Sequence, residues 1–110
     1  MAGNLKVPEN MMEQGYKYIC HGSLSSSKTG AILKKGSDSY LVPVGVFATI
    51  SPKAVITPIE VTAINEITKN GKLTNLEIRY RINGEINQIL LKFYTPNEFL
   101  TIADKLGYGG

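Results

Sequence analysis

The sequence has no tryptophan, one cysteine, one histidine and two arginines. Because Cys20 is alone, no disulfide can form within the chain. No metal site is expected, since His21 is the only imidazole and metal ligand sets need several such groups. No hydrophobic run approaches the roughly 20 residues of a membrane-spanning helix. Residues 1–10 also lack the apolar segment of a signal peptide, so we expect an intracellular, cytoplasmic protein.

The chain is also short of recognisable catalytic groups. It contains no pair of carboxylates in an apolar loop and no Ser-His-Asp set. Cys20 and His21 are neighbours in a predicted strand, so their side chains point to opposite faces and cannot easily share a proton. The segment 22–30 begins and ends with glycine but lacks the glycine spacing and the Gly-Lys-Ser/Thr order of a phosphate-binding loop. We therefore expect a protein that is not an enzyme, with no catalytic residue, cofactor or metal.

What the sequence does contain is typical of one small globular domain. It has 110 residues and a mass of 12.0 kDa, with 43% hydrophobic and 19% charged residues. That length suits a single core, and the composition excludes bulk disorder. We expect a flexible N-terminus over 1–7, one domain over 8–107 and a tail over 108–110.

Most of the chain follows a β pattern. A short helix is expected after Pro8, ending at Gly15, with Met11 and Met12 partly covering a core edge. Alternation then places Tyr16, Tyr18 and Cys20 on one face of a strand. About seven strands are expected, over 16–24, 31–34, 40–50, 54–57, 61–68, 73–82 and 85–93. Pro43 cannot donate to a strand ladder, so the third of these lies at an edge or bends.

The segment 57–69 permits two interpretations. Thr57-Pro58-Ile59-Glu60 has the form of a helix capping box with proline at the first helical position. The residues that follow are β-branched and favour a strand: Val61, Thr62, Ile64, Ile67 and Thr68. We take the strand for 61–68.

The clearest local pattern is a hairpin around Asn83-Gly84, a dipeptide that suits a two-residue type I′ turn. If Ile82 pairs with Glu85, Ile78 faces Ile89 and Leu76 faces Leu91. One face then carries Leu76, Ile78, Tyr80, Ile82, Ile89, Leu91 and Phe93. The other carries Glu77, Arg79, Arg81, Gln88 and Lys92. The register and the burial pattern agree, as a true hairpin requires.

The chain is expected to end in a helix. Thr95, Pro96 and Glu98 occupy the N-cap, N1 and N3 positions of a helix start. An apolar stripe follows, made of Phe99, Leu100, Ile102, Ala103 and Leu106. Gly107 suits the helix stop. The predicted class is α+β and mainly β.

This order of elements resembles the pleckstrin-homology-like (PH-like) superfold, in particular small bacterial PH-like and GRAM-like domains. The residues that carry the likeness are 13–22, similar to an opening strand, 57–64, similar to an apolar-Pro-apolar segment, and 76–106, similar to a last hairpin and closing helix. The resemblance implies a bent antiparallel barrel closed by one C-terminal amphipathic helix. It does not assign a function, because this superfold hosts lipid, peptide and self-association roles.

Three functions remain open. The first is a protein-interaction or self-association module, since 41–47 is more apolar than one half-exposed strand needs and could offer an edge to a partner strand. The candidate interaction edge is Val42, Val44, Val46 and Phe47. If these residues are instead a core strand, Val44→Asp should unfold the protein.

The second is peripheral binding to an anionic membrane. No acidic residue lies between Glu13 and Asp38, and the candidate lipid surface in this interval is Lys17, Lys28, Lys34 and Lys35. Each lysine near an anionic surface contributes about 1 kcal/mol. The third is a ubiquitin-like modifier or carrier, suggested by the terminal Gly109-Gly110. Nucleic acid is not an expected partner, since Arg79 and Arg81 lie on the opposite hairpin face from Tyr80 and the net charge is only +3.

Overall fold

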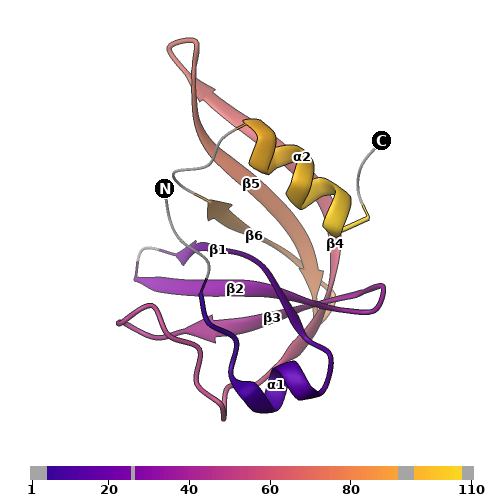
Figure 1. Cartoon of the computed structure of the whole chain (residues 1–110). Helices are drawn as coiled ribbons and strands as arrows, with labels where there is room; N and C mark the ends of the chain where they lie inside the picture. The colour runs from indigo at the N-terminus through magenta and orange to yellow at the C-terminus, as the bar shows by residue number, and fades with distance from the viewer. Residues whose placement is uncertain (1–4, 26, 92–95, 108–110) are drawn as a thin grey trace.

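The computed structural model describes residues 5–25, 27–91 and 96–107 (Figure 1). Two short helices and six strands make up this part of the chain. They are α1 (Glu9–Glu13), β1 (Lys17–Ser25), β2 (Lys28–Lys35), β3 (Asp38–Val44), β4 (Thr57–Lys69), β5 (Lys72–Ile82), β6 (Glu85–Leu91) and α2 (Pro96–Lys105). The mainly β, α+β class is confirmed, with six strands described where about seven were expected. No helix in the described ranges is long and apolar enough to cross a membrane.

The strands form one antiparallel sheet in sequence order. Because β1 also pairs with β6, through Ser23 and Leu90, the sheet closes on itself. That closing seam has a single register pair, and the next shortest lies between β3 and β4, which pair over residues 39–41 and 57–59. Figure 1 shows α1 beneath β1–β3 and α2 at the other end of the molecule. The β4–β5 hairpin extends past the rest of the sheet.

The predicted hairpin is confirmed in its register. Ile82 pairs with Glu85, Ile78 with Ile89, and Leu76 with Leu91. The turn residue Asn83 has a positive φ of 50° and Gly84 one of 82°, as a type I′ turn requires. The inward face is buried or half-buried at Leu76, Ile78, Tyr80, Ile82, Ile89 and Leu91. Lys92 and Phe93, expected on this hairpin, lie outside the described residues.

Several predicted strand limits were wrong. The segment 54–57 is not a strand of its own, since β4 begins at Thr57 and continues to Lys69. The strand interpretation of 57–69 is confirmed over the helix. The third strand ends at Val44 instead of residue 50, because the chain turns away after Pro43 and Gly45. β2 begins at Lys28, so the polar connection between β1 and β2 is shorter than predicted.

The alternation predicted for the first strand is interrupted by a register shift between Tyr18 and Cys20. A β-bulge places an extra residue in one strand and breaks the strict in–out pattern. Ile19 and Cys20 are consequently both buried in the same cluster, whereas alternation alone assigned them to opposite faces. The bulge also brings Tyr18 and His21 close enough to form a hydrogen bond.

Two hydrophobic clusters lie on opposite faces of β1–β3. The first fills the inside of the closed sheet and contains Ile19, Cys20, Ile32, Leu76, Ile78, Tyr80, Ile89, Leu91 and Ile102. The second contains Val7, Met11, Ala31, Leu33, Val42 and Ile50. Successive β2 residues point alternately into the two clusters, so this strand is covered on both faces. The segment before α1 and the β3–β4 connection supply the outer cover.

The helices and the N-terminal segment depart from prediction at three positions. Met11 is buried in the second cluster, but Met12 is half exposed. Leu100 was assigned to the apolar stripe of the last helix, yet 65% of its surface is exposed, while Ile102 and Ala103 are buried. Val7 was assigned to a flexible terminus and is buried, so packing begins before residue 8. Thr95, Gly109 and Gly110 lie outside the described residues.

Candidate functional site

The predicted interaction edge divides into a buried half and an exposed half. Val42 is fully buried in the second cluster, and Val44 is half-buried against it. Val46 and Phe47, in contrast, are 96% and 86% exposed. These two are the most exposed large hydrophobic side chains in the described ranges, so only this half of the edge is available to a partner.

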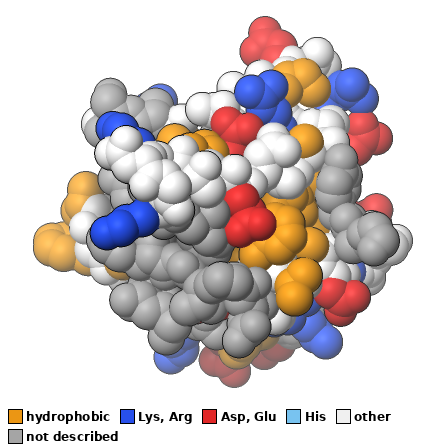
Figure 2. All heavy atoms as spheres, turned by 90° about the horizontal axis from the view of Figure 1, so that it is seen from above, with side chains coloured by type: hydrophobic (Ala, Val, Ile, Leu, Met, Phe, Trp, Pro, Cys, Tyr) orange, Lys and Arg blue, Asp and Glu red, His pale blue; other side chains and the backbone are white. Residues whose placement is uncertain are grey.

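Val46 and Phe47 sit at the end of a tight turn, which we call the tip (residues 45–49). The Gly45 amide donates to the Thr49 carbonyl at 2.8 Å, and the Ala48 amide donates to the Gly45 carbonyl at 3.0 Å. This pattern matches a type I turn followed by a left-handed residue. The turn holds the two apolar side chains out in solvent. In the view from above, hydrophobic side chains project at the left edge, the side on which the β3–β4 connection protrudes in Figure 1 (Figure 2).

Ala48 carries backbone strain at this turn. Its φ is +55°, in the left-handed region that residues with a Cβ rarely adopt. The other described residues with a side chain and positive φ are Asn70 and Asn83, and asparagine tolerates this region well. A strained residue beside two exposed apolar side chains is typical of a functional loop.

Ala48→Gly is expected to stabilise the protein by about 0.5–1 kcal/mol, since glycine removes the left-handed penalty but adds freedom to the unfolded chain. Urea denaturation measures the change. Ala63→Gly is the control, because Ala63 lies inside β4 without a positive φ. That change should destabilise by a similar amount. A loss of stability with Ala48→Gly would contradict the strained turn.

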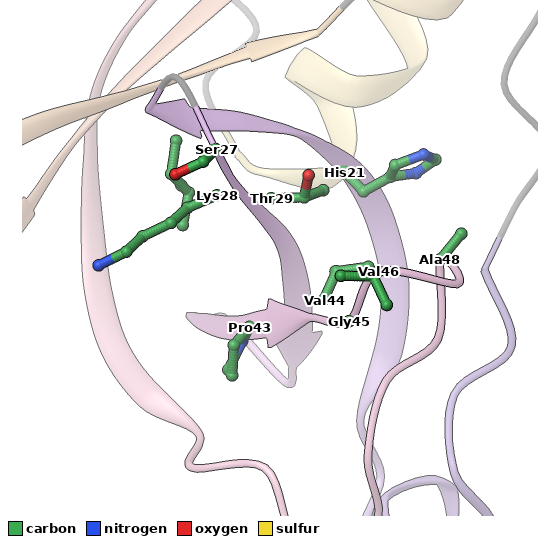
Figure 3. Close-up of a pocket in the computed structure, with 10 residues that line it drawn as sticks. His21, Ser27, Lys28, Thr29, Pro43, Val44, Gly45, Val46 and Ala48 are labelled. Atoms are coloured by element: carbon green, nitrogen blue, oxygen red, sulfur yellow. The ribbon is translucent and has the colours of Figure 1, made fainter.

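A pocket of about 660 Å³ lies at the foot of the tip (Figure 3). It is formed by the end of β1, the start of β2, the end of β3 and the tip. Its lining residues are His21, Leu24, Ser27, Lys28, Thr29, Pro43, Val44, Gly45, Val46 and Ala48. This size falls in the range of ordinary ligand sites. The predicted residues Lys28, Val44 and Val46 are thus brought together at one place, although they came from two different hypotheses.

The pocket combines apolar walls with few polar groups. Lys28 is the one lysine, arginine, aspartate or glutamate in the lining; the Ser27 hydroxyl lies near the Lys28 side chain, and the Thr29 hydroxyl lies nearer to His21 (Figure 3). The His21 ring points away from them, and its Nδ1 lies 2.5 Å from the Tyr18 hydroxyl. Burial lowers the pKa of His21 and is the main cause that raises the pKa of Tyr18. Both pKa shifts fit a neutral imidazole whose Nδ1 accepts a hydrogen bond from the Tyr18 hydroxyl.

The four candidate lipid-binding lysines do not form one surface. Lys28 begins β2 and Lys35 ends it, so their Cα atoms are separated by roughly 23 Å of strand. Lys17 pairs in register with Lys34, which places both at the far end from Lys28. Lys34 Nζ donates to the Lys105 carbonyl at the end of α2, and Lys35 Nζ lies 5.0 Å from the centre of the Tyr16 ring. The four lysines therefore lie at two ends of the β1–β2 pair.

The other nucleophilic and charged side chains considered above are buried or form ion pairs within the domain. Burial raises the pKa of Cys20 to about 12, so its thiol stays protonated and is a poor nucleophile. Arg79 Nε donates to the Glu77 carboxylate at 2.9 Å, and Arg81 to the Glu60 carboxylate at 2.7 Å. Hydrogen bonds from Asn65 and Arg79 lower the pKa of Glu77. Within the described ranges, no cluster of three metal-ligating side chains is present.

Comparisons with family models, curated proteins and solved structures give no match to this chain. The candidate site therefore depends on its own geometry. Sequence reasoning identified Val46 and Phe47 but missed Ala48, Ser27 and Thr29. No sequence pattern predicts a left-handed backbone conformation at an alanine. The pocket could not be predicted either, because it forms only where three strand ends come together in the fold.

Proposed function

We propose that this chain is a non-enzymatic binding or assembly module with a PH-like barrel, which contacts a protein through the tip. The observation that carries the proposal is the near-complete exposure of Val46 and Phe47 on a turn fixed by two backbone hydrogen bonds. When a partner covers a large aromatic side chain that was exposed to water, the free energy of the complex is lowered. Fixing the turn in advance lowers the entropy lost on binding.

The fold supports the same proposal. A six-stranded antiparallel sheet that closes on itself, with a C-terminal helix at one end, agrees with the PH-like resemblance of residues 76–106. The rival membrane function loses support because Lys34 and Lys35 lie far along β2 from Lys28 and from the tip. The carrier function relies on Gly109-Gly110, which the described ranges do not include.

Site-specific photo-crosslinking in cells that produce the full chain tests the proposal. The benzophenone residue replaces Phe47 (Phe47→p-benzoylphenylalanine), and Ile86→p-benzoylphenylalanine serves as control, since Ile86 is half exposed on β6. We expect a discrete protein adduct from position 47 and none from position 86. Mass spectrometry then identifies the adduct, whether a second copy or another protein.

If the adduct contains another protein, excess unlabelled wild-type chain should compete it away, whereas the unlabelled Phe47→Ser chain should not. Position 47 giving no protein adduct, or the same adducts as position 86, would contradict a protein-binding role for the tip.

A further inference from the structure

We infer that the partner of the tip is a second copy of this chain, with the tip of each copy seated in the pocket of the other. This inference rests on the proposed function and adds the identity of the partner. It follows from three properties of the described site: the match between tip and pocket, their adjacency, and the place of the lysines.

The tip and the pocket match in chemistry. The tip offers Val46 and Phe47, which carry no charge and no side-chain hydrogen-bonding group. The pocket offers apolar walls from Leu24, Pro43 and Val44. A Phe47 ring from a second copy would replace water against these walls.

The tip and the pocket are also adjacent. Val46 and Ala48 line the pocket, while Phe47, between them, does not. A surface that carries a projection beside a hollow is complementary to itself about a two-fold axis, because each projection then fills the other hollow. Such an arrangement closes after two copies and makes both contacts at once. Any other protein would have to supply its own matching projection.

The distribution of charge favours a protein over a membrane. An apolar tip that enters an anionic bilayer gains from several lysines beside it, each contributing about 1 kcal/mol. Here the pocket at the foot of the tip contains Lys28 alone, and Lys17, Lys34 and Lys35 are at the other end of the β1–β2 pair. A second copy needs no such flanking charge.

The pairing should be weak. The pocket lining comprises ten residues, and Phe47 adds one more, whereas a standard stable interface uses about 20–30 residues on each side. A dimer that forms at high micromolar concentration and dissociates on dilution fits this size. The measurement must therefore cover a wide range of concentration.

Sedimentation velocity of the full chain tests the inference, from about 5 µM to about 1 mM at about 0.15 M ionic strength. The expected mass rises from 12.0 kDa toward twice that value. Phe47→Ser removes the projection, and Thr29→Arg fills the hollow. Each should weaken the association by about tenfold or more, as loss of a central aromatic anchor does. Val55→Ser is the control, because Val55 is 74% exposed but does not line the pocket.

Mixing the two variants separates this arrangement from other dimers. Phe47→Ser keeps its pocket and Thr29→Arg keeps its tip, so a mixed pair regains one of the two contacts. We expect the mixture to associate more strongly than either variant alone. Thermal melting checks that both variants fold. If Thr29→Arg does not fold, Ser27→Arg at the exposed pocket rim takes its place.

The outcomes are distinct. A wild-type chain that stays monomeric at the highest concentration overturns the inference, and so does a mixture that gains nothing. In either case, a crosslink from Phe47 to another protein would leave the proposed function standing. Flotation of the monomeric wild-type chain with vesicles of phosphatidylserine and phosphatidylcholine, lost in Phe47→Ser, would replace the protein partner with a membrane.

Discussion

Gly22→Ala is expected to destabilise the protein by about 3 kcal/mol or more. A Cβ at position 22 would lie 2.2 Å from the Leu90 carbonyl oxygen and 2.8 Å from its carbon. These are backbone atoms of β6 and cannot rotate away. Next to Gly22, Ser23 pairs with Leu90 and joins β1 to β6. The added methyl group therefore forces the closing seam of the sheet apart.

Urea denaturation measures the loss, and Gly45→Ala is the matched control. A Cβ at Gly45 would lie 3.5 Å from the nearest atoms, which is ordinary contact, and Gly45 has no positive φ. That substitution should change the free energy of unfolding by less than about 1 kcal/mol. Equal losses from Gly22→Ala and Gly45→Ala would argue against close approach of β1 and β6.

The sequence predicted best where local turn chemistry and hydrophobic pattern agree. Asn83-Gly84 determines the turn, the turn determines the register, and the register places Ile78 and Ile89 together, as the structure confirms. The stop of the last helix at Gly107, with its φ of +71°, follows from the same kind of local rule. In 57–69, β-branched residues outweighed the capping pattern, because β4 can pair along almost its whole length with β5.

Prediction failed where long-range packing decides the outcome. A strict two-residue alternation cannot predict the bulge between Tyr18 and Cys20, through which the consecutive residues Ile19 and Cys20 are both buried. Lys28 and Lys35 are close in sequence, but they lie at opposite ends of β2, which is longer than predicted. The run 41–47 is apolar throughout, and nothing local shows that Val42 enters a second core while Phe47 remains in water. That second core requires the segments before α1 and after β3 to cover one face of the sheet.

Ile89→Ala is expected to lower the free energy of unfolding by about 2–5 kcal/mol, the range for truncating a fully buried isoleucine. Ile89 is 0% exposed and faces Ile78 in the first core. Its neighbours belong to a closed sheet, which cannot easily collapse around the cavity. If the slope of the unfolding free energy against urea concentration stays the same, the variant has lost stability while the native state remains as compact as before.

Leu100→Ala is the informative control for this substitution, because the helical stripe in the sequence predicts a similar cost for both residues. In the structure Leu100 is 65% exposed on α2, and Ile102 packs into the first core instead. We therefore expect Leu100→Ala to cost less than about 0.5 kcal/mol. A cost near that of Ile89→Ala would mean that α2 turns a different face to the sheet. The comparison thus decides between the face given by helical periodicity and the face given by packing.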